Sequence, residues 1–93
     1  MEAAKILVVD DDPDIVAVLD ELLGKEGHQV TTCSTGADAI AAGRDQQFDV
    51  VVADIRLPDV DGLAVLRAYQ EASPDAAVIV TTAFGTVETA IQA

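Results

Sequence analysis

The stretch that decides the fold is KILVVDDDP, residues 5–13. A short, continuous run of apolar branched residues is typical of a strand covered on both faces, as in a parallel sheet. Pro13 cannot continue a strand ladder, but it suits the first turn of a helix, with Asp12 before it as the N-cap. Residues 5–13 therefore predict a buried strand that leads directly into a helix.

The rest of the chain repeats this alternation of apolar strands and helices. Further strands are predicted at residues 29–33, 48–54 and 77–82, and helices at residues 13–24, 37–43, 63–72 and 86–93. Strict alternation of near-continuous apolar strands with helices predicts an α/β protein, in which a parallel sheet carries helices on both faces.

Length and composition limit the domain organisation. The chain has 93 residues, of which 51% are hydrophobic, so we expect one small domain over residues 1–93. Its longest apolar run is far shorter than the roughly 18 residues that span a bilayer, and the N-terminus lacks the pattern of a signal peptide. We therefore expect a soluble, cytoplasmic protein.

The charge balance excludes several classes of partner. Lys and Arg number 5 against 17 Asp and Glu, which gives a net charge of −12. Direct nucleic-acid binding needs a basic face, and an anionic membrane would repel this chain. Cations, or a protein with a basic surface, are the expected ligands. The one cysteine, Cys33, is interpreted as a buried structural thiol in a reducing compartment.

Carboxylates follow two of the predicted strands where each strand ends. Asp10 and Asp11 close the first strand and Asp54 closes the third, while Thr82 closes the fourth. Ligands of open α/β sheets bind beyond these carboxyl ends. Crowded carboxylates need a neutralising cation, and an oxygen-only set favours Mg²⁺ over zinc. Beside such an ion Asp54 could act as a nucleophile towards phosphorus, and Thr82 could bind phosphoryl oxygens.

Other polar residues have simpler explanations. Asp12 is explained by N-capping, and Asp49 by its place on the surface at the start of a strand. Asp59 and Asp61 are interpreted as turn formers, with Asp61 as a possible cap of the third helix. His28 follows a helix stop and is interpreted as an ordinary loop residue.

Four short segments together resemble the receiver domain of two-component response regulators. They are ILVVDD at 6–11, VVVAD at 50–54, LP with DG at 57–62, and VTTA at 80–83. The resemblance runs from the first strand to residue 93 and implies a flavodoxin-like sheet with strand order 2-1-3-4. Residues 82–90 look most like the nitrogen-regulation class, whose receivers govern σ54-dependent activator domains.

The resemblance also implies roles for individual residues. Asp54 matches the aspartate that accepts a phosphoryl group from a phosphohistidine of a sensor histidine kinase. The domain would catalyse this transfer and the later hydrolysis itself, and would control an output domain. Mg²⁺ would be bound directly by Asp11 and Asp54, mainly through water by Asp10, and by the backbone carbonyl of Arg56, while Thr82 and Ala83 would form the switch that contacts the phosphoryl group.

Family receivers also have a fifth strand that begins with a lysine, followed by a fifth helix, and neither is evident here. The chain is therefore expected to be an incomplete receiver without the catalytic lysine. A strand at 77–82 without that neighbour would expose an edge carrying Val78, Ile79 and Val80. This edge suggests an alternative function, a self-associating scaffold that dimerises through it.

Two enzymatic alternatives are weaker. Phosphatases with an aspartyl intermediate often place a second Asp two residues after the nucleophile, where this chain has Arg56. A dinucleotide-binding site would need a Gly-rich turn after the first strand, where this chain has Asp-Asp-Asp-Pro.

Overall fold

The structure is a computed structural model that describes residues 3–81 and the backbone of residues 87–90. Helices and strands alternate along the chain as predicted up to residue 81. The elements are β1 (Lys5–Val9), α1 (Pro13–Lys25), β2 (Gln29–Cys33), α2 (Gly36–Asp45), β3 (Val50–Asp54), α3 (Gly62–Ala72), β4 (Ala77–Thr81) and β5 (Val87–Ala90).

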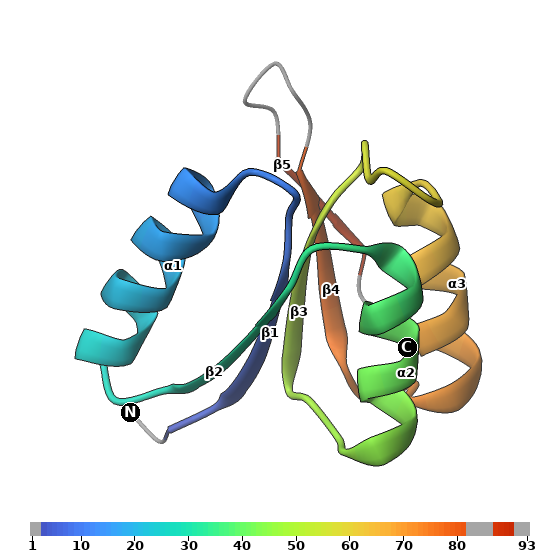
Figure 1. The fold of residues 1–93 in the computed structure, drawn as a ribbon. Helices are drawn as coiled ribbons and strands as arrows, with labels where there is room; N and C mark the ends of the chain where they lie inside the picture. The colour runs from blue at the N-terminus through green and yellow to red at the C-terminus, as the bar shows by residue number, and fades with distance from the viewer. Residues whose placement is uncertain (1–2, 82–86, 91–93) are drawn as a thin grey trace.

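One sheet with strand order β2-β1-β3-β4-β5 forms the centre of the molecule (Figure 1). The first four strands are parallel, with Val9 opposite Ala53 and Asp54 opposite Thr81 in the register. The predicted flavodoxin-like order 2-1-3-4 is confirmed. Because β1 and β3 are neighbours, their carboxyl ends lie side by side.

Helices cover the two faces of the sheet unequally. α2 and α3 lie side by side on one face, and α1 lies on the other (Figure 1). Under α2 and α3, alternate strand residues form a dry core with the ring of Tyr69. The strand residues of this core are Leu7, Val9, Val51, Ala53, Val78 and Val80.

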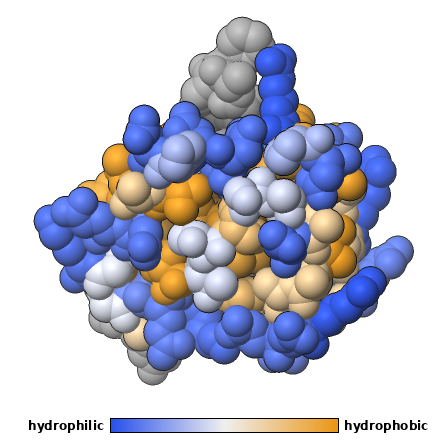
Figure 2. All heavy atoms as spheres, in the orientation of Figure 1, coloured by the Kyte–Doolittle hydropathy of each residue, from blue (hydrophilic) through white to orange (hydrophobic). Residues whose placement is uncertain are grey.

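The α1 helix on the second face is less buried than α2 and α3. The α1 helix begins at Pro13 with Asp12 as N-cap and ends before Gly27, whose φ of +89° favours glycine. It packs on β1 and β2, yet none of its residues is buried. Apolar patches accordingly break the polar surface near α1 (Figure 2). The large exposed apolar side chains of α1 are Ile15, Val18 and Leu22.

The helix predicted at residues 86–93 is wrong over Val87–Ala90, which form β5. This strand pairs antiparallel with β4, with Thr81 opposite Val87 and Val78 opposite Ala90. Unpaired N–H and C=O groups along β4 favour a further strand, whereas an eight-residue helix is marginal by itself. The exposed β4 edge expected as a dimerisation surface is therefore also wrong. A parallel fifth strand does not occur within residues 3–81 and 87–90.

Two smaller features complete the fold. His28 lies in the loop before β2, as predicted, and its Nδ1 accepts a hydrogen bond from the Ala4 amide at 3.0 Å. None of the helices in the described residues has the length and apolar character needed to cross a membrane.

Candidate metal centre

Three carboxylates meet at the carboxyl ends of two adjacent strands. Asp10 and Asp11 directly follow β1, and Asp54 is the last residue of β3. One oxygen from each of the three lies within 4.8 Å of the others. The sequence predicted that these carboxylates crowd together if the first and third strands are neighbours, and β1 does pair with β3.

Asp10 is the buried member of this cluster, with a relative exposure of 7%. Its Oδ1 accepts a hydrogen bond from the Asp12 amide at 2.9 Å, which fixes the turn into α1. Burial raises the pKa of the Asp10 carboxyl, and the negative charges of Asp54 and Asp11 raise it further, against the opposing effect of that hydrogen bond. The site therefore contains a costly negative charge that a cation would stabilise.

Asp54 is held in place by contacts with the loop that follows it and with β4. Its Oδ1 accepts a hydrogen bond from the Arg56 amide at 3.0 Å. The amide of Ile55, the residue directly after Asp54, donates a hydrogen bond to the carbonyl oxygen of Thr81 at 2.8 Å. A Cβ at Gly62 would lie 2.6 Å from the Asp54 carbonyl oxygen, so only glycine lets α3 begin this close to β3. The position of Asp54 is thus fixed by main-chain contacts as well as by its own side chain.

The loop between β3 and α3, residues 55–61, closes on itself at its base. Arg56 and Asp61 form an antiparallel bridge, and the Gly62 amide donates to the Ile55 carbonyl at 2.9 Å. Asp61 also caps α3, because its Oδ1 accepts from the Ala64 amide at 2.9 Å. The predicted capping role of Asp61 is confirmed.

Asp59, at the tip of this loop, has a role that the sequence did not reveal. Its two carboxylate oxygens accept hydrogen bonds from the Gly36 and Ala37 amides of α2, at 2.8 and 2.9 Å. These two amides hold the pKa of Asp59 below its ordinary range. The partners lie 23 and 22 residues apart in sequence, so no local pattern could have indicated the contact.

The three clustered carboxylates fit a hard divalent cation such as Mg²⁺. Oxygen ligands on opposite sides of one Mg²⁺ are about 4.2 Å apart, since each lies about 2.1 Å from the ion. A cluster within 4.8 Å can therefore hold the ion with two carboxylates and reach it through water with the third. The cluster contains neither His nor Cys, the usual zinc ligands.

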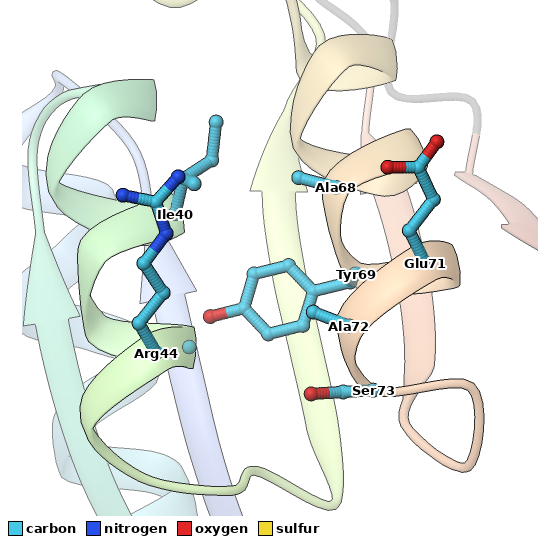
Figure 3. A pocket seen from close by; sticks show the side chains of 8 residues that line it. Ile40, Arg44, Ala68, Tyr69, Glu71, Ala72 and Ser73 are labelled. Carbon is cyan, nitrogen blue, oxygen red and sulfur yellow. The ribbon is translucent and has the colours of Figure 1, made fainter.

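A separate groove of about 260 Å³ lies between α2 and α3 (Figure 3). The ring of Tyr69 lies between the two helices, with Arg44 and Glu71 on opposite sides of the groove (Figure 3). A Cβ at Gly43 would lie 2.7 Å from Tyr69 Cζ, so this glycine makes room for the ring. The Tyr69 hydroxyl donates to the Ala39 carbonyl, so the aromatic residue serves helix packing.

The remaining candidates divide into two groups. Thr82 and Ala83, predicted to form the switch, lie outside the described residues. Cys33 is a half-buried free thiol that packs against the core, and burial raises its pKa to about 11. It is therefore protonated near neutral pH, in agreement with a structural role.

Comparison with known proteins agrees with this fold. Residues 6–93 match the response regulator receiver domain, and the chain belongs to that family. The transcriptional regulatory protein ZraR of Salmonella typhimurium is 40% identical over 88 residues, which are 95% of this chain and 20% of that protein. The chain thus spans about one fifth of the length of this curated relative.

Two solved receiver domains have the same fold. One is a solution structure of the beryllofluoride-activated NtrC4 receiver domain dimer, with a TM-score of 0.82 and 36% identity, covering 88% of this chain and 68% of that one. The other is the response regulator TrrA from Thermotoga maritima in complex with Mg²⁺ and beryllofluoride, with a TM-score of 0.79 and 37% identity, covering 85% and 69%. These relatives confirm the recognition as a receiver of the nitrogen-regulation type.

Proposed function

We propose that this receiver accepts a phosphoryl group on Asp54, from a phosphohistidine of a sensor histidine kinase. The observation that carries the proposal is the cluster of Asp10, Asp11 and Asp54, whose oxygens lie within 4.8 Å of one another. Asp10 accepts a hydrogen bond from the Asp12 amide, but burial and its acidic neighbours still raise the pKa of its carboxyl, so this bond does not offset the cost of the clustered negative charge. A cation bound next to the reacting group would offset that cost.

We assign Mg²⁺ as the ion, as in the complex described for TrrA. Asp11 and Asp54 would bind it directly, Asp10 mainly through water, and the Arg56 backbone carbonyl would add a ligand. When bound, Mg²⁺ neutralises negative charge on the carboxylates and on the phosphoryl oxygens. The protein's own contribution is to hold the acceptor and the ligands in place before the donor arrives.

Asp54 then acts as the nucleophile. Its Oδ1 accepts a hydrogen bond from the Arg56 amide, so we assign the other carboxylate oxygen, Oδ2, as the attacking atom. An electron pair of Oδ2 forms the new P–O bond while the P–N bond of the phosphohistidine breaks, and the leaving pair returns to the imidazole. Thr82 and the backbone at Ala83 would bind the phosphoryl oxygens. Later hydrolysis would return Asp54 to its free carboxylate.

The wider role follows from the relatives. We propose that residues 1–93 act as a receiver domain that controls a transcriptional output domain in the cytoplasm, since ZraR is a transcriptional regulatory protein. With a net charge of −12, the receiver itself would not contact DNA. The kinase, which must approach Asp54, is expected to present a surface of opposite charge.

The test is phosphorylation with a small donor. The protein is incubated with Mg²⁺ and acetyl phosphate, and its intact mass is measured. We expect a gain of one phosphoryl group in the wild type and in Asp49→Asn, an exposed acid elsewhere on the molecule, and no gain in Asp54→Asn. A folded wild-type sample that shows neither a mass gain nor binding of Mg²⁺ with beryllofluoride would contradict the proposal.

A further inference from the structure

Asp59 joins two segments that are distant in sequence. The amides it binds, those of Gly36 and Ala37, belong to the first two residues of α2, whose N–H groups have no partner within the helix. A local cap is also present, because Thr35 Oγ1 accepts from the Asp38 amide at 3.1 Å. The start of α2 is therefore capped twice, once from its own sequence and once from the loop that follows Asp54.

Apolar packing supports the same contact. Val60, next to Asp59, is half-buried and packs against the core. A Cβ at Gly36 would overlap Val60 Cγ2 and would lie 3.4 Å from Asp59 Oδ1. The absence of a side chain at Gly36 thus allows the loop tip to rest directly on the end of α2.

The base of the same loop carries the chemistry. Arg56 donates its amide to Asp54 Oδ1 and is bridged to Asp61 across the loop. Only residues 57–60 separate these bridged positions, so the tip and the base of the loop cannot move independently. A tip fastened to α2 therefore restricts the main chain that contacts Asp54.

We propose that Asp59 is a positioning residue, whose carboxylate fastens the β3–α3 loop to α2 and so holds the main chain at Arg56 against Asp54. Its effect on Mg²⁺ binding rests on the proposed function, whereas its effect on the loop does not. A carboxylate suits this place, because it is ionised near neutral pH and lies at the positive end of the α2 dipole.

The experiment compares Asp59→Ala and Asp59→Asn with two matched controls in the whole chain. Thr35→Ala removes the other cap of α2 without touching the loop. Asp38→Asn removes a negative charge from the same end of α2 and leaves the Asp59 contact in place. Amide hydrogen exchange at Arg56 is measured by NMR without metal, and the dissociation constant for Mg²⁺ is measured by titration.

We expect exchange at Arg56 to accelerate about tenfold in Asp59→Ala and less in Asp59→Asn, whose amide oxygen can still accept one hydrogen bond. The dissociation constant for Mg²⁺ should rise about tenfold in Asp59→Ala, and less than about threefold in both controls. Rescue by Asn would separate positioning from charge, because Asn and Ala remove the same charge.

Equal exchange at Arg56 in Asp59→Ala and Thr35→Ala would overturn the proposal, because the effect would then be a general loosening of α2. Equal weakening of Mg²⁺ binding in Asp59→Asn and Asp38→Asn, with Arg56 exchange unchanged in both, would also overturn it in favour of a charge effect. If the wild type bound no Mg²⁺, the proposed function would fail, and the metal-free exchange data would still decide whether Asp59 holds the loop.

Discussion

The hydroxyl group of Tyr69 in α3 donates a hydrogen bond to the carbonyl oxygen of Ala39 in α2 at 2.7 Å. Both residues are buried, Tyr69 with 2% of its surface exposed and Ala39 with none. The bond therefore joins the two helices within the core, on the face of the sheet that they share. Burial raises the pKa of Tyr69 from 10.0 to about 12, with a smaller contribution from Cys33.

This shift predicts a loss of stability in alkali. The folded state favours the neutral phenol, so the contribution is fully present below pH 10 and is lost as the pH rises through about 12. We expect the free energy of unfolding to fall by about 2–3 kcal/mol over this range. Chemical denaturation at each pH measures it, and phenolate absorbance reports Tyr69 alone because the chain has one Tyr and no Trp.

Tyr69→Phe is the matched variant. Its free energy of unfolding near neutral pH should be about 1 kcal/mol lower than that of the wild type, because the hydrogen bond to Ala39 is missing. Its stability should also fall less steeply between pH 10 and 12, with the remaining slope due to Cys33, whose pKa is about 11. Identical alkaline slopes in Tyr69→Phe and the wild type would show that Tyr69 is not the group responsible.

Replacing two helical glycines by alanine should change the stability of the protein in opposite directions. A Cβ at Gly24 in α1 meets nothing within 4 Å, so Gly24→Ala should stabilise the protein by about 0.5–1 kcal/mol through helix propensity. A Cβ at Gly62 would collide with the Asp54 carbonyl, so Gly62→Ala should cost about 1–3 kcal/mol. Thermal unfolding of the two variants compares them directly, and a stabilising Gly62→Ala would contradict the close approach of α3 to β3.

The buried charge of Asp10 predicts a conflict between stability and ion binding. Asp10→Asn removes a carboxylate whose pKa is raised by burial and by its acidic neighbours, and keeps an oxygen for the Asp12 amide. We expect the metal-free protein to gain about 0.5–2 kcal/mol and the stabilisation by Mg²⁺ to shrink. Melting temperatures with and without Mg²⁺ test both effects.

Asp75→Asn, at an exposed acid beyond α3, is the control for that comparison. It should change neither the metal-free stability nor the Mg²⁺ response by more than about 0.5 kcal/mol. A metal-free Asp10→Asn protein that is less stable than the wild type would mean that Asp10 contributes mainly through its hydrogen bond.

The unequal cover of the sheet predicts different costs for adjacent residues of β3. Val51 is fully buried beneath α2 and α3, while Val52 points to the other face and is half-buried. We expect Val51→Ala to cost about 2 kcal/mol, and Val52→Ala less than about 1 kcal/mol. Urea denaturation of the two variants measures the difference, and equal costs would contradict the assignment of the core to one face.

Much of this structure could be predicted from local sequence patterns. Apolar runs gave the four parallel strands, and the cap of α1 was visible in Asp12 and Pro13. The rule about where parallel strands end placed Asp10 and Asp54 on one side of the sheet, and their convergence also required the first and third strands to be neighbours. These features depend on neighbours in sequence or on the general geometry of α/β sheets.

The features that sequence did not predict depend on tertiary context. The spacing of apolar residues in 87–90 also suits a helix. These residues form a strand because they pair with the edge of β4. The exposure of Ile15 and Leu22 depends on how little of the sheet α1 covers, which helical spacing cannot show. The local sequence around Asp59 indicates only a turn, because its hydrogen-bond partners on α2 are distant in sequence.

The antiparallel direction of β5 determines where a probe attached to this strand would lie relative to Asp54. Because β5 is antiparallel, Ala90 pairs with Val78 near the start of β4, whereas Asp54 pairs with Thr81 at its finish. A fluorescent reporter attached to the side chain at position 90 would thus lie toward the opposite end of β4 from the acceptor carboxylate. Such labelling should permit signalling assays without obstructing the donor's approach.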